Sequence, residues 1–357
     1  MSVASRLPYT NHTHIRCFLR YPNDPMSRAL DKSVKEALKH GDHQRVFLDI
    51  SDVLIESSDR LLEIELLGKS HILDPSSTIL RDENAVAIPK LRIVQAFIVA
   101  QKLHKEFLTE DGDVSGKDIL RSTAIMLLMD PEHLTAANTR KRLIMTKPKD
   151  KDVENIIRSE QHFLDSLLTS RLHRHTKSPT LWNHRRWLME QYRLHDIEVP
   201  VEDDISNIIM VSGERHPRNY YAWCHARYLI NAFILPLSKA EEALSRMIAS
   251  TQKWCFAHHN DISGWQFLIF MLDKRPSETS AVFRETLKLA CSFKWRNESV
   301  WYFLRYIAAW GAGTADMEEF ENVRRGLLDN AAGDESGKRT LENATQWLEV
   351  THEIAAK

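Results

Sequence analysis

The sequence predicts an all-α protein built from helical hairpins that repeat along the chain. Tryptophan recurs at Trp182, Trp223, Trp265 and Trp301. With Ala137 as an earlier member, these key positions are spaced by 45, 41, 42 and 36 residues, and a period of about forty residues is typical of a two-helix repeat. Glycine is also scarce, at 11 of 357 residues, and scarce glycine favours long helices over turn-rich sheets.

The residue four positions before each tryptophan predicts where its helix begins. These residues are good helix N-caps, namely Ser178, Asn219, Asp261 and Asn297. Pro179 occupies the favoured first helical position, and Pro217 blocks continuation of any helix before it. The copy at Ala137 has His133 in this place, which is a poor cap. We therefore expect five helices that begin at equivalent points of successive repeats.

The N-terminal third is less regular. Residues 26–40 have helical spacing, residues 44–55 fit a strand or a helix, and residues 61–89 have the composition of a loop-rich connection. Residues 91–107 again have a clear helical pattern. We expect three parts, an irregular or mixed N-terminal region, a repeat domain and a C-terminal helical cap, over residues 1–85, 86–310 and 311–357.

A second kind of helix alternates with the tryptophan helices from residue 115 onward. These helices are expected over residues 117–129, 153–172, 201–214, 237–256 and 278–293. Ser238 and Glu241 form a potential capping box for one of them. Because the linkers are short, neighbouring helices must run antiparallel. A helix over residues 316–329 and a last one bearing Trp347 resemble a degenerate final repeat.

The composition restricts the classes of partner and site. The chain has 48 basic and 49 acidic residues, a formal net charge of −1, which argues against wholesale nucleic-acid binding. No apolar run approaches a membrane span and no signal sequence opens the chain, so we expect no membrane insertion and a cytoplasmic location. The four cysteines form no CxxC pair, and we expect them to be buried packing residues. The histidine pairs His173/His175 and His258/His259 lack cysteine or carboxylate at ligand spacing, so no metal site is predicted.

Arginines form a second pattern beside the key positions. They stand three residues after the key position at Arg140 and Arg185, and four after it at Arg186, Arg227 and Arg305. Positions three and four apart share a helix face with the key residue. One interpretation is structural, with each arginine stacking on an aromatic ring and pairing with a carboxylate between repeats. The other is functional, with some arginines meeting a phosphate or a partner's acidic surface.

The segments Ser178–Leu188 and Asn219–Arg227 resemble the repeats of protein prenyltransferase α subunits, whose pattern is roughly Pro-x-Asn-Tyr-x-x-Trp-x-x-Arg. Asn297–Leu304 resembles the later repeats of that family, in which arginine is commonly lost. Leu127–Leu143 is similar to the first repeat of the branch called prenyltransferase α-subunit repeat-containing protein, the α subunit of a type-III-like protein geranylgeranyltransferase. The resemblance covers residues 60–310. Ala137 in place of tryptophan and Ala226 in place of arginine depart from the pattern.

The resemblance implies a right-handed superhelical crescent of antiparallel hairpins that wraps a separate β subunit similar to that of Rab geranylgeranyltransferase. It implies that the zinc lies on this partner β subunit and that this chain binds no cofactor. The isoprenoid diphosphate would lie at the subunit seam, and a prenyl-acceptor protein would bind the complex. The expected function is transfer of a geranylgeranyl or farnesyl group to a cysteine of that acceptor. The alternative is a non-catalytic helical scaffold that mediates protein–protein interaction.

The resemblance also implies site residues. A lysine and a tyrosine of the family motif approach the diphosphate, and Arg218 and Tyr220 take their places in this sequence. A cation beside a leaving diphosphate stabilises the charge that develops on its oxygens. The alternative is that Arg218 is a solvated loop residue and Tyr220 packs at the seam. Trp182, Trp223, Trp265 and Trp301 are expected in the repeat core, and the residues expected at the partner interface are Arg185, Asn219, Tyr221 and Arg227.

Overall fold

The computed structural model describes residues 36, 38–68, 77–109, 114–146, 153–310 and 313–355. The chain divides into two units, residues 1–42 and 43–357, and all the elements named below belong to the second. Most of the helix expected over residues 26–40 lies outside the described residues.

The second unit begins with α3 (His43–Ile55) and a small sheet made of β1 (Glu63–Leu67), β2 (Leu80–Asp82) and β3 (Ala85–Pro89). β3 is the central strand, parallel to β1 and antiparallel to β2. One face of β1 and β3 is buried at Ile64, Val86 and Ile88. Residues 44–55 are therefore helical, and the prediction of a loop-rich connection over residues 61–89 missed three strands. Strands of five residues or fewer carry little periodic signal in the sequence.

The same region packs onto the helices that follow it. α3 contacts α4 (Lys90–Thr109) and α5 (Gly116–Met129). The backbone N–H of Leu62 donates to Ser166 Oγ over 3.0 Å. The unit boundary accordingly lies between residues 42 and 43, whereas the boundary predicted from the sequence, at residue 85, falls inside the sheet.

The rest of the unit is a series of helical hairpins, each made of an opening segment and a second helix, which we call the Trp helix. The Trp helices are α6 (Leu134–Met145), α9 (Pro179–Leu194), α12 (Tyr220–Leu229), α14 (Ile262–Lys274) and α16 (Glu298–Trp310). The opening segments include α5, α7 (Val153–Leu168) with α8 (His173–Thr176), α10 (Val201–Asp204) with α11 (Met210–Arg215), α13 (Ala240–Ala257) and α15 (Thr279–Ser292). A last hairpin is formed by α17 (Thr314–Asp329) and α18 (Glu335–Ala355).

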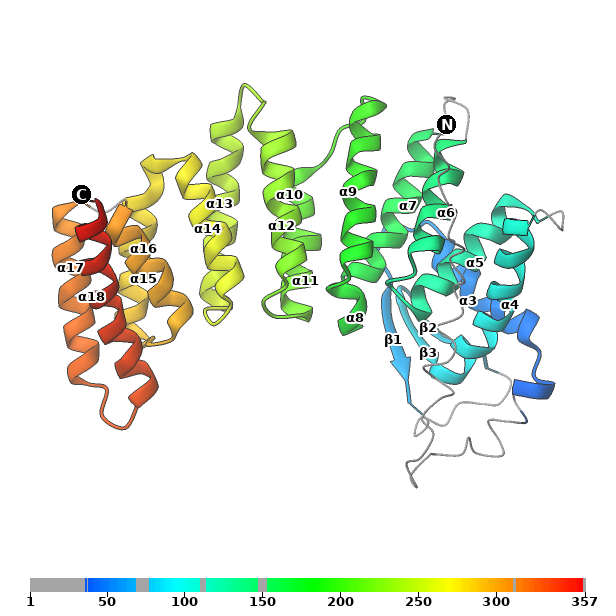
Figure 1. Ribbon diagram of the computed structural model, residues 1–357, viewed down its shortest axis with the longest axis horizontal. Coiled ribbons are helices and arrows are strands. Elements are labelled where there is room, and N and C mark those ends of the chain that lie inside the picture. Colours follow the sequence, from blue (N-terminus) through cyan, green and yellow to red (C-terminus); the bar gives the residue numbers. More distant parts are fainter. Residues whose placement is uncertain are drawn as a thin grey trace, which may run out of the picture. The chain divides into compact units, whose positions relative to one another are not determined.

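Successive hairpins lie side by side in chain order, as Figure 1 shows for α5 to α18. The Trp helices contact one another in the order α6, α9, α12, α14 and α16, and α16 contacts α18. The all-α repeat architecture predicted from the spacing of the tryptophans is confirmed. No described helix combines the length and apolar character needed to cross a membrane.

Local irregularities depart from the predicted helices. The opening segment of the third hairpin contains the π-helical stretch η1 (Ile205–Ile209), and α12 continues into a second one, η2 (Ile230–Ile234). A short 3-10 turn, η3 (Pro276–Glu278), precedes α15. The capping box predicted from Ser238 and Glu241 is wrong, because α13 begins after Lys239 and has no side-chain cap.

Large aromatic side chains join the repeats through the core. Trp223, Trp265 and Trp301 are almost completely buried, and Trp182 is 3% exposed. Trp265 lies 4.9 Å, between ring centroids, from a phenylalanine of the next Trp helix, Phe303. Burial of such rings contributes on the order of 3–5 kcal/mol each, as judged by the cost of their removal.

Candidate functional site

The loops that precede the Trp helices form one edge of the repeats, which we call the loop edge. The helices α9, α12 and α14 begin at side-chain caps, as the sequence predicts. Ser178 Oγ accepts from the Leu181 N–H, Asn219 Oδ1 from the Ala222 N–H, and Asp261 from the N–H groups of Ser263 and Gly264. His133 also caps, because its Nδ1 accepts from the Ala136 N–H. It is thus a better cap than expected.

In two places a shared carbonyl oxygen links the key tryptophan of one repeat to the asparagine that precedes the next Trp helix. The Thr176 carbonyl accepts from Trp182 Nε1 in its own repeat and from Asn219 Nδ2 in the next repeat, both at 2.8 Å. The His259 carbonyl repeats this arrangement, accepting from Trp265 Nε1 at 3.1 Å and from Asn297 Nδ2 at 2.8 Å. The cap asparagine and the key tryptophan therefore align consecutive repeats through one acceptor.

Arg218 stands where this arrangement breaks. The repeat after Trp223 has Asp261 instead of asparagine, and a carboxylate cannot donate to a carbonyl. Asp261 Oδ2 accepts from the backbone N–H of Arg218 at 2.6 Å instead, and Trp223 Nε1 has no partner among the described residues. Arg218 has a φ of +60°, in the left-handed region that non-glycine residues seldom adopt. Asp261 thus holds the Arg218 backbone in this conformation.

Tyr220 and Tyr221 follow at the exposed start of α12. Tyr220 is 68% exposed and Tyr221 39% exposed, and their rings meet edge to face at 5.4 Å. A hydrogen bond between Tyr220 and Cys224 raises the pKa of Tyr220, so its hydroxyl stays protonated at neutral pH. The side chain of Arg218 is exposed and forms no ion pair with the residues that the structure describes. Arg218 and Tyr220 therefore both present polar groups to solvent beside Asn219.

The neighbouring loop before α9 contributes further basic groups. His173 Nδ1 lies 3.3 Å from His216 Nδ1. Partial burial lowers the pKa of His216, and the nearby Lys177 and His173 lower it further. The loop edge between α9 and α12 therefore gathers several basic groups.

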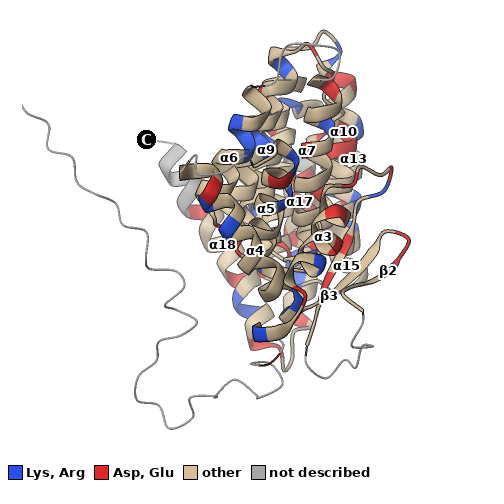
Figure 2. Cartoon of the chain, turned by 90° about the vertical axis from the view of Figure 1, so that its right-hand side faces the viewer, with Lys and Arg blue, Asp and Glu red and all other residues tan. Residues whose placement is uncertain are grey.

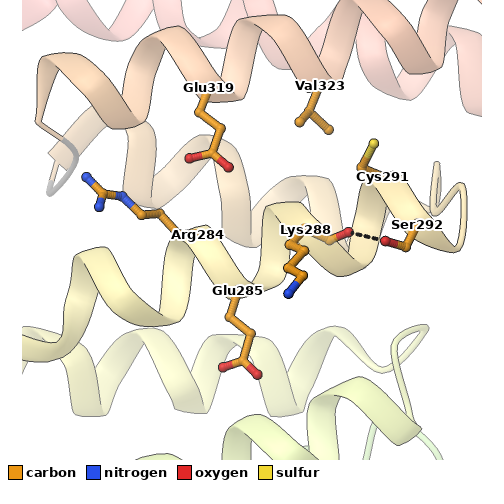
Figure 3. A pocket seen from close by; sticks show the side chains of 7 residues that line it. All are labelled: Arg284, Glu285, Lys288, Cys291, Ser292, Glu319 and Val323. Carbon is orange, nitrogen blue, oxygen red and sulfur yellow. Dashed lines mark hydrogen bonds between the residues drawn. The ribbon is translucent and has the colours of Figure 1, made fainter.

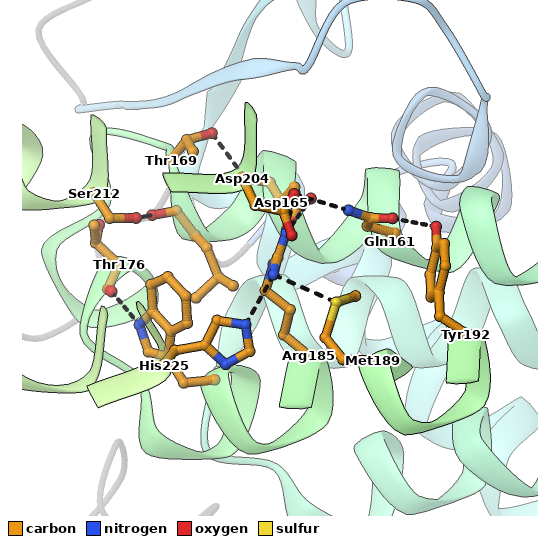
Figure 4. A network of polar contacts seen from close by, with 12 residues as sticks. Gln161, Asp165, Thr169, Thr176, Arg185, Met189, Tyr192, Asp204, Ser212 and His225 are labelled. Atoms are coloured by element: carbon orange, nitrogen blue, oxygen red, sulfur yellow. Dashed lines mark hydrogen bonds and ion pairs between the residues drawn. The ribbon is translucent and has the colours of Figure 1, made fainter. Parts of the chain in front are cut away.

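Two residues predicted at the partner interface are internal. Asn219 is 1% exposed, because its side chain is used by the cap and by Thr176. Arg185 is completely buried, donates to Asp165 at 2.7 Å and pairs with Asp204 at 2.9 Å (Figure 4). The prediction that Arg185 and Asn219 face a partner is therefore wrong for this chain, because both side chains are buried and bond to groups inside the repeats.

The network around Arg185 has unusual protonation. Burial disfavours the Arg185 cation, but Asp165 and Asp204 outweigh it and raise the pKa of Arg185. Burial and the nearby Asp165 raise the pKa of Asp204 to about 6, against the attraction of Arg185. His225 Nε2 accepts from Arg185 Nη1 at 2.8 Å, and burial followed by the guanidinium lowers the pKa of His225 well below its usual value. The imidazole is therefore neutral.

The earlier repeat has an equivalent ion pair. Arg140 donates to both carboxylate oxygens of Glu160, at 2.8 and 2.7 Å, and both side chains are buried. Arg140 and Arg185 occupy the same place after their key positions. Their pairing with carboxylates agrees with the structural interpretation of these arginines.

The cations that stand four residues after the key positions lie on the exposed face of the Trp helices. Each of them stacks on an aromatic ring of the next repeat. Lys141 Nζ lies 5.6 Å from the centre of the Trp187 ring, and Arg186 Cζ lies 4.3 Å from that of Tyr228. Arg227, which was predicted at the partner interface, lies 5.7 Å above Phe270 and is half-buried. The aromatic residues that follow the key positions were not predicted, although all stand five residues after a key position: Trp187, Tyr228, Phe270 and Tyr306.

Two family models match within this region. One is described as the protein prenyltransferase alpha subunit repeat and matches residues 165–192, and the other as the ECM9 middle domain, matching residues 181–292. The chain is thus similar to the prenyltransferase α-subunit repeat family over residues 165–192. The first match contains Asp165, Trp182 and Arg185, so the buried ion pair of Figure 4 is built from residues of the family repeat.

Curated proteins from yeast and vertebrates are similar to this chain. Protein ECM9 of Saccharomyces cerevisiae is 26% identical over 220 residues, which is 59% of this chain and 56% of that protein. The human protein prenyltransferase alpha subunit repeat-containing protein 1 is 26% identical over 261 residues, 66% of this chain and 60% of that protein. The matches thus span less than two thirds of the length of either relative.

The last hairpins also bear a surface groove between α15 and α17, which was not predicted from the sequence. Its volume is about 550 Å³, and its lining residues are Arg284, Glu285, Lys288, Cys291, Ser292, Glu319 and Val323 (Figure 3). Cys291 is exposed and Cys224 half-buried, so the expectation of buried packing cysteines holds for Cys255 alone among the described cysteines. Cys17 lies outside the described residues.

The repeats carry charge of both signs. In Figure 2, basic residues in blue lie near α6 and α9, while α10 with its acidic run Glu202–Asp204 is red. Within the described parts of the chain, no three histidine, cysteine or acidic side chains gather in a way that could hold a metal ion.

Proposed function

We propose that this chain is the non-zinc α subunit of a heterodimeric protein prenyltransferase, which assists transfer of a geranylgeranyl or farnesyl group to a cysteine of an acceptor protein. The observation that carries the proposal is the exposed pair Arg218 and Tyr220 at the motif position of a family repeat. Neither Arg185 nor Asn219 can serve this purpose, because both are buried. The complex is expected in the cytoplasm.

Arg218 and Tyr220 would act on the leaving group. When the carbon–oxygen bond to the diphosphate breaks, negative charge grows on the departing oxygens, and donors placed in advance stabilise it. The guanidinium of Arg218 can donate two parallel hydrogen bonds to such oxygens. The hydroxyl of Tyr220 is protonated at neutral pH and can donate a further one. Asp261 keeps the Arg218 backbone in place for this task.

The remaining parts of the site would come from the partner. A β subunit similar to that of Rab geranylgeranyltransferase would hold the zinc, which lowers the pKa of the acceptor cysteine and gives a thiolate nucleophile. The isoprenoid diphosphate would lie at the seam between the subunits, next to Arg218. This chain would thereby complete the site from the side opposite the zinc.

A second function is favoured by a separate observation. Arg185, Asn219 and the key tryptophans of the family motif are fully used in packing and hydrogen bonds between repeats. Their presence is therefore explained by architecture alone. A non-catalytic scaffold that binds other proteins would keep the same residues without any role in prenyl transfer.

The proposal is tested by combining the chain with candidate β subunits and measuring transfer of labelled isoprenoid to an acceptor. We expect copurification with one of them, and slower transfer in Arg218→Ala with nearly unchanged association. Tyr220→Phe should have a smaller effect of the same kind. Arg246→Ala is the matched control, because Arg246 is an exposed arginine of α13 paired with Glu202. A chain that binds a partner protein but gives no transfer with any β subunit would indicate the scaffold.

A further inference from the structure

The exposed face of the Trp helices carries a ladder of cations and aromatic rings. In each of three repeats, the cation four residues after the key position lies over the aromatic ring five residues after the next key position. The pairs are Lys141 with Trp187, Arg186 with Tyr228 and Arg227 with Phe270. We call these six residues the ladder. Because α6, α9, α12 and α14 contact one another in this order, the ladder is continuous across four helices.

The rings of the ladder are neither in the core nor free in solvent. Trp187, Tyr228 and Phe270 are half-buried at the boundary between adjacent Trp helices. Tyr228 donates its hydroxyl hydrogen to Glu190 of the preceding repeat, which fixes the ring. Rings held in this way offer a rigid apolar surface that loses little side-chain entropy when it is covered by another molecule.

The cations of the ladder retain unused hydrogen-bond donors. Lys141, Arg186 and Arg227 form no ion pair with the residues that the structure describes, whereas most other arginines of the repeats do. Arg186 is exposed, and Arg227 donates only to the Trp223 carbonyl at 3.2 Å. A guanidinium stacked on a ring keeps its N–H edge free for a carboxylate. The stacking therefore orients donors that have no acceptor within the chain.

The charge balance of this face is positive. Glu190 also lies on it, but its carboxylate is taken up by Arg193 and Tyr228. Asp273 lies further along, and burial raises its pKa. The unpaired charge of the ladder thus comes from its three cations, and a complementary surface must carry carboxylates.

The size and composition of the ladder fit a protein surface. Four adjacent helices at a usual separation of 8–10 Å extend over about 30 Å, which suits an interface of ordinary size. Tryptophan, tyrosine and arginine are the residues most enriched at the centres of such interfaces. A small anionic ligand would engage one cation only, whereas a folded partner can reach all three.

We propose that the ladder docks the catalytic subunit of the prenyltransferase through a row of carboxylates on that subunit. The inference rests on the proposed function and adds the surface and the chemistry by which the partner is held. The cations of the ladder pair with the partner's carboxylates, and the rings pack beneath apolar side chains between them. Arg218 is not a member of the ladder, whereas Tyr220 lies within electrostatic reach of Arg227 at the edge of the ladder.

The test measures the affinity of the purified full chain for the catalytic β subunit that copurifies with it, by titration calorimetry at low and high salt. Reversing two charges in Arg186→Glu/Arg227→Glu should weaken binding by about thirtyfold or more, because like charges would then face each other. The conservative pair Arg186→Lys/Arg227→Lys should bind with intermediate affinity, since lysine keeps the charge but loses the planar fork. Circular dichroism verifies that each variant is folded.

The matched control is Lys253→Glu/Lys288→Glu, which reverses two exposed cations on the opening helices α13 and α15. It should bind within about twofold of the wild type. If the double arginine reversal also binds within twofold, the docking surface is refuted while the proposed function stands. If the wild-type chain binds no catalytic subunit, both the docking surface and the proposed function are refuted. A homodimer of the wild type that the arginine reversal dissociates would identify a second copy as the occupant and would equally overturn the proposal.

Discussion

The side-chain amide of Asn219 donates to the carbonyl oxygen of Thr176 over 2.8 Å, across the boundary between two repeats. The same asparagine caps α12 with its other amide atom, since Oδ1 accepts from the Ala222 N–H. One side chain therefore begins a helix and also aligns that helix with the previous repeat. Its burial, at 1% exposure, means that water cannot replace either contact.

Asn219→Asp separates these two functions. Aspartate still caps the helix but has no N–H for Thr176, and it places a carboxylate against a carbonyl oxygen. We expect a loss of roughly 1–3 kcal/mol in the free energy of unfolding, measured with urea. Asn183→Asp on the exposed surface of α9 is the control and should cost less than about 0.5 kcal/mol. Equal effects of the two substitutions would show that the bond to Thr176 contributes nothing.

The key tryptophans should differ in how well they tolerate phenylalanine. Trp301 Nε1 donates to the Trp295 carbonyl at 2.9 Å, whereas Trp223 Nε1 is buried without a partner. Trp301→Phe loses packing and a hydrogen bond, while Trp223→Phe loses packing but removes an unsatisfied donor. The cost of Trp223→Phe in urea unfolding should therefore be smaller by about 1 kcal/mol. A larger cost at Trp223 would contradict this assignment.

These contacts also show what a sequence can predict. The cap at Asn219 and the helix of Trp223 follow from residues within one turn of each other, so their spacing revealed the repeats. Arg185 was different. Its carboxylate partners Asp165 and Asp204 lie about twenty residues away on either side, and nothing local distinguishes an arginine that faces them from one that faces another protein.

Other features fall between these cases. The ladder could have been predicted, because Tyr228 and Phe270 have the same sequence spacing from their key positions. The more conspicuous tryptophan repeat drew attention away from this spacing. The sheet could not be predicted from local sequence, since β1 pairs with β3, which lies about twenty residues further along the chain. The replacement of asparagine by Asp261 is visible in the sequence, yet its effect on the Arg218 backbone depends on packing between repeats.

Asp204 should make the stability of the chain depend on pH. Its pKa is raised from 3.8 to about 6, chiefly by burial, so the folded state binds this proton more tightly than the unfolded state does. The contribution of Asp204 to stability is therefore highest below pH 4 and falls as the pH rises from about 4 to about 6. The resulting penalty at neutral pH is on the order of 2–3 kcal/mol.

Asp204→Asn should remove this dependence. The difference in unfolding free energy between variant and wild type should become more favourable to the variant as the pH rises from 4 to 7. Taking the difference cancels the titration of His175, whose lowered pKa of about 4 acts in the opposite direction in both proteins. Asp203→Asn, at an exposed neighbouring carboxylate, is the control. A difference that stays constant with pH would contradict the raised pKa of Asp204.

Arg185 and Arg186 are adjacent in the sequence but should respond to alanine in opposite ways. Arg185 is completely buried between Asp165 and Asp204, and its removal leaves two carboxylates without a cation in the interior. Breaking a buried ion pair from one side costs roughly 3–5 kcal/mol. Arg186 is exposed and loses only its stacking on Tyr228, a contribution of about 0.5–1 kcal/mol.

Urea unfolding of Arg185→Ala and Arg186→Ala measures these costs, and partner binding gives the second readout. Arg185→Ala should lower stability strongly, and any loss of binding should follow the loss of folded protein. Arg186→Ala should remain almost as stable as the wild type and still bind the catalytic subunit several-fold more weakly, because its guanidinium belongs to the ladder. If Arg186→Ala were destabilised as much as Arg185→Ala, the stacking of Arg186 would be part of the core. The ladder could then not be an exposed docking surface.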